Sequence, residues 1–163
     1  MNKKSILENY INKNIDALYR FAYTYMKNED DACDVVNESV VKALKAVSSL
    51  RSEDNVKCWL YKIISNTAFT YLGKNKKVIY LDDEMQERLY ANDDYSSMNF
   101  EELVKNLPLK YKSIIVLRFL EDMSIKDIAH ILDLNENTVK TRLYKALNML
   151  KIELEGDYET QRY

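Results

Sequence analysis

The fold is decided by residues 124–150, which read SIKDIAHILDLNENTVKTRLYKALNML. Ser124 is a favourable helix N-cap, and the acidic Asp127 follows three positions later. Apolar residues then recur at helical spacing until residues 133–135, whose Asp and Asn favour turns and caps. Asn135 can cap a second helix. The apolar face of that helix comprises Val139, Leu143, Ala146, Leu147 and Leu150. This pattern predicts a helix-turn-helix, whose second helix enters the DNA major groove.

The outward face of the second helix is basic. Between residues 135 and 151 there are four basic residues and one acidic residue, a net charge of +3. Basic side chains neutralise phosphates, while Thr, Arg and Asn reach base edges. The predicted DNA contacts are Asn137, Thr138, Lys140, Thr141, Arg142, Tyr144 and Lys145. The alternative is a solvated face on an ordinary helical hairpin.

Composition predicts an all-α chain. The 163 residues include only 2 Gly and 1 Pro, and they suffice for one domain or two small ones. No stretch approaches the about 20 apolar residues of a membrane span, and the N-terminus lacks the apolar core of a signal peptide. Cys33 and Cys58 follow no metal or redox spacing, so we expect both to be buried or half-buried. His130 has no neighbouring group that suggests catalysis. We therefore predict no metal, no cofactor, no small-molecule substrate and no enzymatic activity.

Charge is segregated along the chain, although the net charge is only −2. Residues 57–81 contain five Lys and no acid, whereas residues 82–102 contain eight acids and one Arg. A DNA-binding protein needs only locally basic surfaces. The overall acidity therefore does not argue against nucleic-acid binding.

Helical periodicity divides the chain into two groups of helices. The first group is expected at 5–26, from 28 or 30 to 47, and at 56–72. A linker follows at 73–99, with a short helix expected at 82–89. The second group begins at 100–106 and, after Pro108, continues at 110–120 and through the helix-turn-helix. Trp59 lies on the basic third helix, where we favour a core role over a DNA contact.

We therefore predict two small helical domains joined by a flexible acidic linker. The predicted boundaries are 1–75, a linker at 76–99, a second domain at 100–155 and an acidic, fraying tail at 156–163. Few contacts are expected to hold the two domains, so they should have no fixed relative position. The free protein should then be more extended than one compact domain.

Three motifs carry a family resemblance. Residues 107–150, LPLKYKSIIVLRFLEDMSIKDIAHILDLNENTVKTRLYKALNML, resemble region 4 of bacterial sigma factors. Residues 30–44, DDACDVVNESVVKAL, resemble region 2.2, and residues 55–72, NVKCWLYKIISNTAFTYL, resemble regions 2.3 and 2.4. Both blocks in this order, with no other domain, resemble extracytoplasmic-function (ECF) sigma factors of the sigma-70 family.

The sequence departs from the family pattern at a few positions. Asp133 stands where the family usually has Gly, which is tolerable because Asp can adopt left-handed backbone. Cys33 replaces a usual Glu, and Thr70 replaces a common Asp. Residues 73–77, GKNKK, contain less Arg than usual. These departures are compatible with a divergent toxin-type or phage-like clade.

The resemblance implies functions for the outward residues. Asp31, Asp34, Asn37 and Glu38 would face the clamp helices of the RNA polymerase β′ subunit. The melted −10 promoter element would be bound by Arg51, Asn55, Lys57, Lys62 and Asn66. The predicted DNA contacts of the second helix would bind the −35 element. The apolar helix at 110–120 would in part meet the β-flap.

The resemblance also implies that the protein acts in the cytoplasm, associated with the nucleoid, and that its activity is regulated. We expect an anti-sigma factor, the cytosolic part of a membrane protein, inserted between the domains. Its anchor would be the exposed part of Ile114, Val116 and Phe119. The alternatives are that these residues are internal and that control is by synthesis alone. A further alternative is a helix-turn-helix regulator that never engages polymerase.

Overall fold

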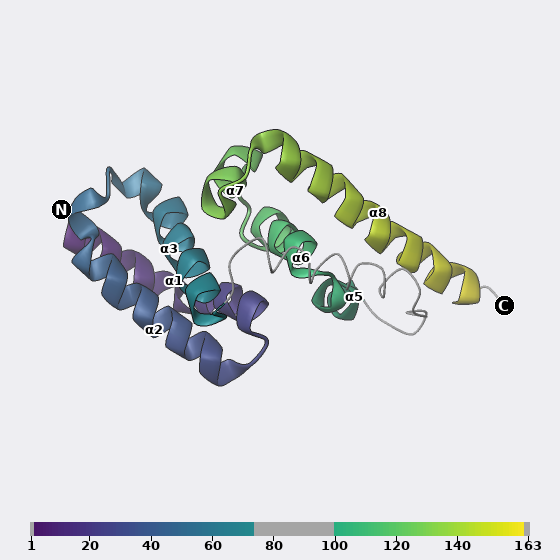
Figure 1. The fold of residues 1–163 in the computed structure, drawn as a ribbon, viewed down its shortest axis with the longest axis horizontal. Helices are drawn as coiled ribbons and strands as arrows, with labels where there is room; N and C mark the ends of the chain where they lie inside the picture. Colours follow the sequence, from purple (N-terminus) through teal and green to yellow (C-terminus); the bar gives the residue numbers. More distant parts are fainter. Residues whose placement is uncertain (1, 74–99, 162–163) are drawn as a thin grey trace.

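The structure, a computed structural model, describes residues 2–73 and 100–161, and these contain helices and no strand. The predicted linker, with its short helix at 82–89, lies outside the described residues. The first domain consists of α1 (Lys3–Met26), α2 (Glu29–Lys45) and α3 (Val56–Tyr71), which pack side by side (Figure 1). Two single 3₁₀ turns, η1 (Val47–Ser49) and η2 (Glu53–Asn55), connect α2 to α3.

The boundary between α1 and α2 is encoded locally. Lys27 adopts the left-handed conformation with φ 61°, which ends α1. Asn28 then caps α2, because its side-chain oxygen accepts a hydrogen bond from the Asp31 amide at 2.8 Å. Three acidic residues in the first turn of α2 complement the positive end of the helix dipole.

The first domain buries the predicted apolar face around an aromatic group. Phe21 lies 4.8 Å from Tyr61 and 5.3 Å from Tyr25, measured between ring centroids. The Tyr25 hydroxyl is satisfied by Ser65 at 3.0 Å. Trp59 is half-buried against this core, as predicted. Ile15 of α1 lies outside this core and is 45% exposed.

The second domain consists of α5 (Phe100–Asn106), α6 (Leu109–Ile115), η3 (Val116–Leu120), α7 (Ile125–Leu132) and α8 (Glu136–Gln161). Pro108 separates α5 from α6, as predicted. The helix expected at 110–120 changes to a π-helical turn at Val116, which shifts the side chains that follow. α8 continues to Gln161, beyond the predicted start of a fraying tail.

The helix-turn-helix forms as its sequence predicts. Ser124 accepts a hydrogen bond from the Asp127 amide at 3.1 Å and caps α7. Asn135 accepts one from the Thr138 amide at 2.7 Å and caps α8. Between the helices, Asp133 adopts φ 55° and ψ 45°, a left-handed conformation that Asp tolerates.

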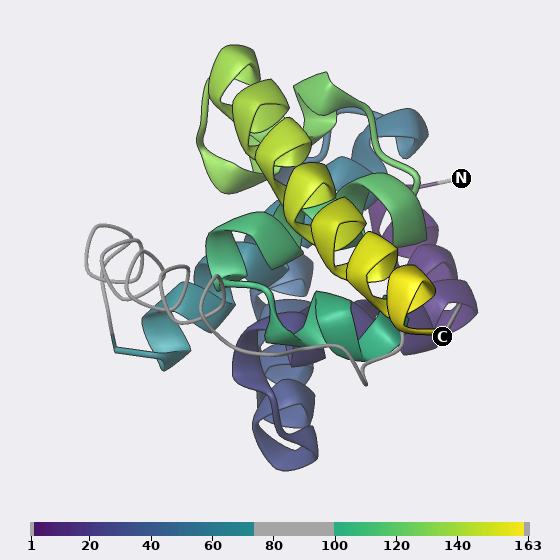
Figure 2. The ribbon, with the colours of Figure 1, turned by 90° about the vertical axis from the view of Figure 1, so that its right-hand side faces the viewer.

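The two domains are in contact, with α3 beside α7 and α1 beside α6 (Figures 1 and 2). Buried apolar side chains from both domains form one continuous cluster, which includes Leu60 on α3 and Ile128 on α7. This differs from the expectation that few contacts hold the domains. The prediction was wrong because the contacts join residues far apart in the sequence, which helical periodicity does not reveal.

Candidate functional site

The predicted −35 residues lie on the first turns of α8 and differ in exposure. Tyr144 is 68% exposed. Four others are also exposed: Asn137, Lys140, Thr141 and Lys145. Thr138 and Arg142 are half-buried, at the edge of the surface that packs on the domain core. The helix therefore presents a basic face with hydroxyl and amide groups, suited to phosphates and base edges.

The predicted −10 residues fall into two sets. Arg51, Asn55 and Asn66 are exposed on the first domain. Lys57 and Lys62 are half-buried because they bond across to the second domain. The Lys62 ammonium lies 3.0 Å from the Asp133 carboxylate in the helix-turn-helix, and the Lys57 ammonium donates to the backbone carbonyl of Glu121. The structure thus does not bring the five residues together on one open surface.

Glu121 is the centre of this contact and was not identified from the sequence. It follows η3, is only 4% exposed, and receives bonds from the first domain. Its Oε1 accepts from Arg20 Nη2 at 2.8 Å and Nε at 3.3 Å, and its Oε2 accepts from the Tyr61 hydroxyl at 2.7 Å. Burial raises the pKa of Tyr61, and the hydrogen bond to Glu121 raises it further. Burial also raises the pKa of Tyr10 to about 12, with the Glu121 carboxylate as the second cause.

The predicted polymerase-binding face lies on α2. Asp34, Asn37 and Glu38 are exposed and Asp31 is half-buried. The Tyr71 hydroxyl of α3 donates to Asp34 at 3.1 Å and to Asp31 at 3.3 Å, which orients both carboxylates. These hydrogen bonds, with burial, raise the pKa of Tyr71. The face can therefore offer fixed carboxylates to a basic partner.

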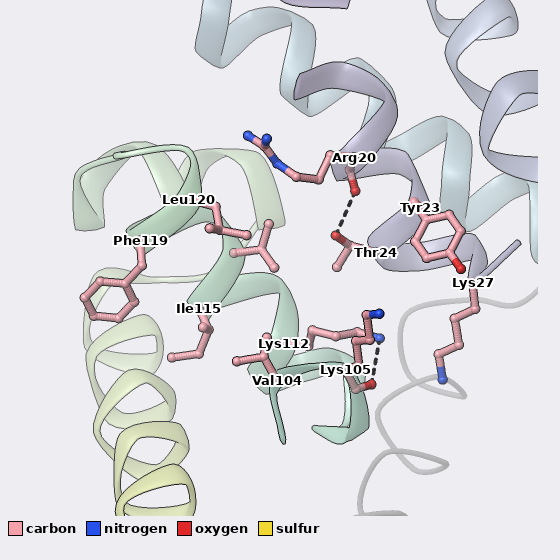
Figure 3. A pocket seen from close by; sticks show the side chains of 11 residues that line it. Arg20, Tyr23, Thr24, Lys27, Val104, Lys105, Lys112, Ile115, Phe119 and Leu120 are labelled. Carbon is pink, nitrogen blue, oxygen red and sulfur yellow. Dashed lines mark hydrogen bonds between the residues drawn. The ribbon is translucent and has the colours of Figure 1, made fainter. Parts of the chain in front are cut away.

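A groove of about 680 Å³ separates α1 from α5, α6 and η3 (Figure 3). Its apolar lining includes Val104, Ile115, Phe119 and Leu120, and its cations include Lys27 and Lys105 (Figure 3). Phe119 and Leu120 are 57% and 56% exposed. These two side chains give the groove an open apolar edge.

Two of the three residues expected to anchor an anti-sigma factor are buried. Ile114 on α6 is 0% exposed and Val116 on η3 is 4% exposed, because both pack into the core, whereas Phe119 is exposed. Cys33 is exposed, against the prediction, while Cys58 is half-buried. His130 is exposed as well. Among residues 2–73 and 100–161 there is no cluster of potential metal ligands, and no helix there has the length and apolarity to cross a membrane.

Two family models match the chain in the same order as the two domains. The model described as Sigma-70 region 2 matches residues 10–78, and the model described as Sigma-70, region 4 matches residues 97–150. Both matched ranges agree with the motifs quoted above.

Curated relatives match along most of their length. The RNA polymerase sigma factor SigV of Bacillus subtilis is 44% identical, over 93% of this chain and 92% of that protein. The ECF RNA polymerase sigma-E factor of Haemophilus influenzae is 32% identical, over 90% of this chain and 84% of that protein.

Solved structures share the fold at lower identity. The sigma factor RpoE of Bartonella quintana, in complex with the anti-sigma factor NepR, has a TM-score of 0.69 and 22% identity, covering 91% of this chain and 96% of that one. CnrH, in complex with the cytosolic domain of CnrY, has a TM-score of 0.64 and 22% identity, covering 93% of this chain and 88% of that one.

Proposed function

Because the chain belongs to the sigma-70 family, as an RNA polymerase sigma factor of the ECF type, we propose that three of its surfaces divide the work of promoter recognition. The acidic face of α2 binds core polymerase, the first domain binds the −10 element and α8 binds the −35 element. The single observation that carries this assignment is the pairing of an oriented acidic face in the first domain with a capped, basic helix-turn-helix in the second.

Core binding is assigned to Asp31, Asp34, Asn37 and Glu38. Carboxylates opposite Arg on a partner helix form short charge-assisted hydrogen bonds, which are about twice as strong as neutral ones. The Tyr71 hydroxyl holds two of these carboxylates in place, so less side-chain freedom is lost on binding. The β′ clamp helices are the proposed partner. A regulator that binds only through its helix-turn-helix would not require such a face.

Promoter binding is divided between the domains. On α8, Lys140 and Lys145 would meet phosphates and base edges in the major groove of the −35 element; their exposure supports this. On the first domain, the exposed Arg51 and Asn66, with Lys57 and Lys62, would hold the melted −10 strand. Capture of extruded bases lowers the cost of strand separation.

An anti-sigma factor is the proposed regulator, and the groove between α1 and η3 is its proposed site. An amphipathic helix with an apolar face would cover Phe119 and Leu120, while acidic residues along its edge would meet Lys27 and Lys105. The similar structures solved in complex with NepR and with the cytosolic domain of CnrY support a partner of this class. If the partner is the cytosolic part of a membrane protein, it holds this chain at the membrane; the chain itself acts in the cytoplasm. Phe119→Asp should abolish recovery of the partner from native cells, whereas Phe119→Leu should retain it.

The direct test of the assignment is a titration against core polymerase. The protein, labelled at a cysteine introduced at the exposed Asn12 of α1 in a Cys33→Ser, Cys58→Ser background, is mixed with purified core enzyme, and the complex is then given a pool of promoter fragments with randomised −35 and −10 positions. We expect a saturable complex that retains fragments sharing two separated motifs. A protein that binds duplex fragments with one motif and ignores core polymerase would instead be a helix-turn-helix regulator.

A further inference from the structure

The contact between the domains uses groups that promoter DNA also requires. Lys57 and Lys62, assigned above to the −10 element, bond instead to Glu121 and Asp133 of the second domain. Asp133 is the turn residue of the helix-turn-helix, and α3 packs along α7, its first helix (Figure 1). In docked helix-turn-helix proteins the first helix crosses the DNA backbone. The described arrangement therefore covers parts of both DNA-binding surfaces.

This arrangement is incompatible with simultaneous binding of both promoter elements. The −10 and −35 elements are named for their positions relative to the transcription start, so they lie about 25 base pairs apart. This separation is about 85 Å of duplex at about 3.4 Å per base pair. In the structure a −10 residue, Lys62, lies 3.0 Å from Asp133 in the −35-binding motif. The domains must separate before both elements can be occupied.

We propose that Glu121 is the latch of an autoinhibited, closed state of the free protein. Its carboxylate is buried, and a buried carboxylate is costly unless it is fully hydrogen-bonded. Within the described residues, Arg20 and Tyr61 supply its side-chain bonds, and both belong to the first domain. Separation of the domains would remove these bonds together, so Glu121 is the polar centre of a closed state that the shared apolar cluster also stabilises.

The latch has a main bond and a weaker second contact. The Arg20–Glu121 and Tyr61–Glu121 bonds are short, at 2.8 and 2.7 Å, and the carboxylate between them is 4% exposed. The Lys62–Asp133 pair is more open, with side chains 29% and 47% exposed, so water screens it. Removal of the Glu121 charge should therefore open the protein more than removal of Asp133.

The inference rests on the proposed function, because closure matters only if polymerase and promoter need the open form. A ligand that binds only the open form has its apparent dissociation constant raised by the reciprocal of the open fraction. Opening variants should therefore bind core polymerase more tightly than the wild-type protein, even though they add no contact to it.

The test measures the distance between the domains in the free, full-length chain. Spin labels are placed on the native, exposed Cys33 and on a cysteine introduced at the exposed Asn148, in a Cys58→Ser background. The doubly labelled protein that keeps Glu121 should give one narrow distribution of distances between the two labels. Glu121→Gln should raise the ratio of open to closed protein by about tenfold or more, because a charge-assisted bond in a buried site is lost. Arg20→Ala, at a half-exposed side chain, should have the same effect without disturbing the core.

The matched control is Asp122→Asn, which removes a neighbouring exposed charge and keeps a residue type suited to its φ of 53°. It should behave as wild type. Identical distance distributions in wild type, Glu121→Gln and Asp122→Asn would overturn the latch, as would a broad distribution in the wild-type protein. Opening without a gain in affinity for core polymerase would overturn autoinhibition. Failure of every variant to bind core polymerase would instead contradict the proposed function. The two outcomes can be told apart because the spin-label distances are measured in the free protein, without polymerase.

Discussion

The acidic face of α2 gives the sharpest prediction about core binding. We expect the double variant Asp34→Arg with Glu38→Arg to lose affinity for core polymerase while keeping its fold. Each charge-assisted contact contributes about 1.5–3 kcal/mol, so loss of two contacts should weaken binding by at least about a hundredfold. Reversed charges facing a basic partner add repulsion to this loss.

The structure indicates that the fold tolerates this change. Asp34 and Glu38 are exposed, and the Glu38–Lys42 pair, 3.3 Å apart with both side chains nearly half exposed, contributes only about 0.3–0.5 kcal/mol. The variant also loses the Tyr71–Asp34 hydrogen bond, which is exposed, so water can replace it. A suitable control is Glu8→Arg with Asp16→Arg, which makes the same change in charge on exposed positions of α1.

The assay is a fluorescence titration of each labelled variant against core polymerase at one fixed salt concentration. Helical content and the midpoint of urea unfolding are measured in parallel. The α1 control should bind as the wild-type protein does. Equal affinities for the α2 variant and the α1 control would refute the assignment of this face.

Further predictions follow from α8, from its cap and from the half-buried Tyr10 of α1. Lys145→Ala should change the preferred base in the −35 element by about 1–3 kcal/mol, whereas Lys140→Ala should weaken binding to all sequences and reduce the salt slope by about 1; identical selected motifs for both variants would contradict base readout. Asn135→Ala should lower the free energy of unfolding by about 1 kcal/mol in urea titrations, and Asn135→Ser should restore it; no loss would mean that the cap does not stabilise the domain. The pKa of Tyr10 is raised to about 12 from 10.0, so the stability that its neutral form provides should be complete below pH 10 and lost towards pH 12. Tyr10→Phe should flatten that part of a stability–pH curve, and an unchanged slope would contradict the shift.

Local sequence patterns predicted the helices and the two caps of the helix-turn-helix, but not the end of α8 or the change of helix type at Val116. The caps at Ser124 and Asn135 form as expected, and of the two starts left open for α2 the structure has the one capped by Asn28, because a cap depends on residues within one turn. The left-handed turn at Asp133 forms as well. Such features need no knowledge of the partner helix, which is why one sequence suffices to predict them.

Contacts between distant segments could not be predicted in this way. Glu121 is an acid beside the apolar end of η3, and nothing in helical periodicity indicates that it is buried against Arg20 and Tyr61, 101 and 60 positions away. The π-helical turn at Val116–Leu120 could not be predicted from periodicity either; within it Val116 is buried and Phe119 is exposed.

The central claim is that this chain directs polymerase to promoters through two domains at once. It is tested most directly by transcription in vitro with purified core polymerase and a template pool with randomised −35 and −10 positions. We predict transcripts that begin at a fixed distance from two paired motifs and that require this protein. Templates that lack either motif should give little product. Absence of protein-dependent transcripts, with duplex binding through α8 retained, would contradict the account.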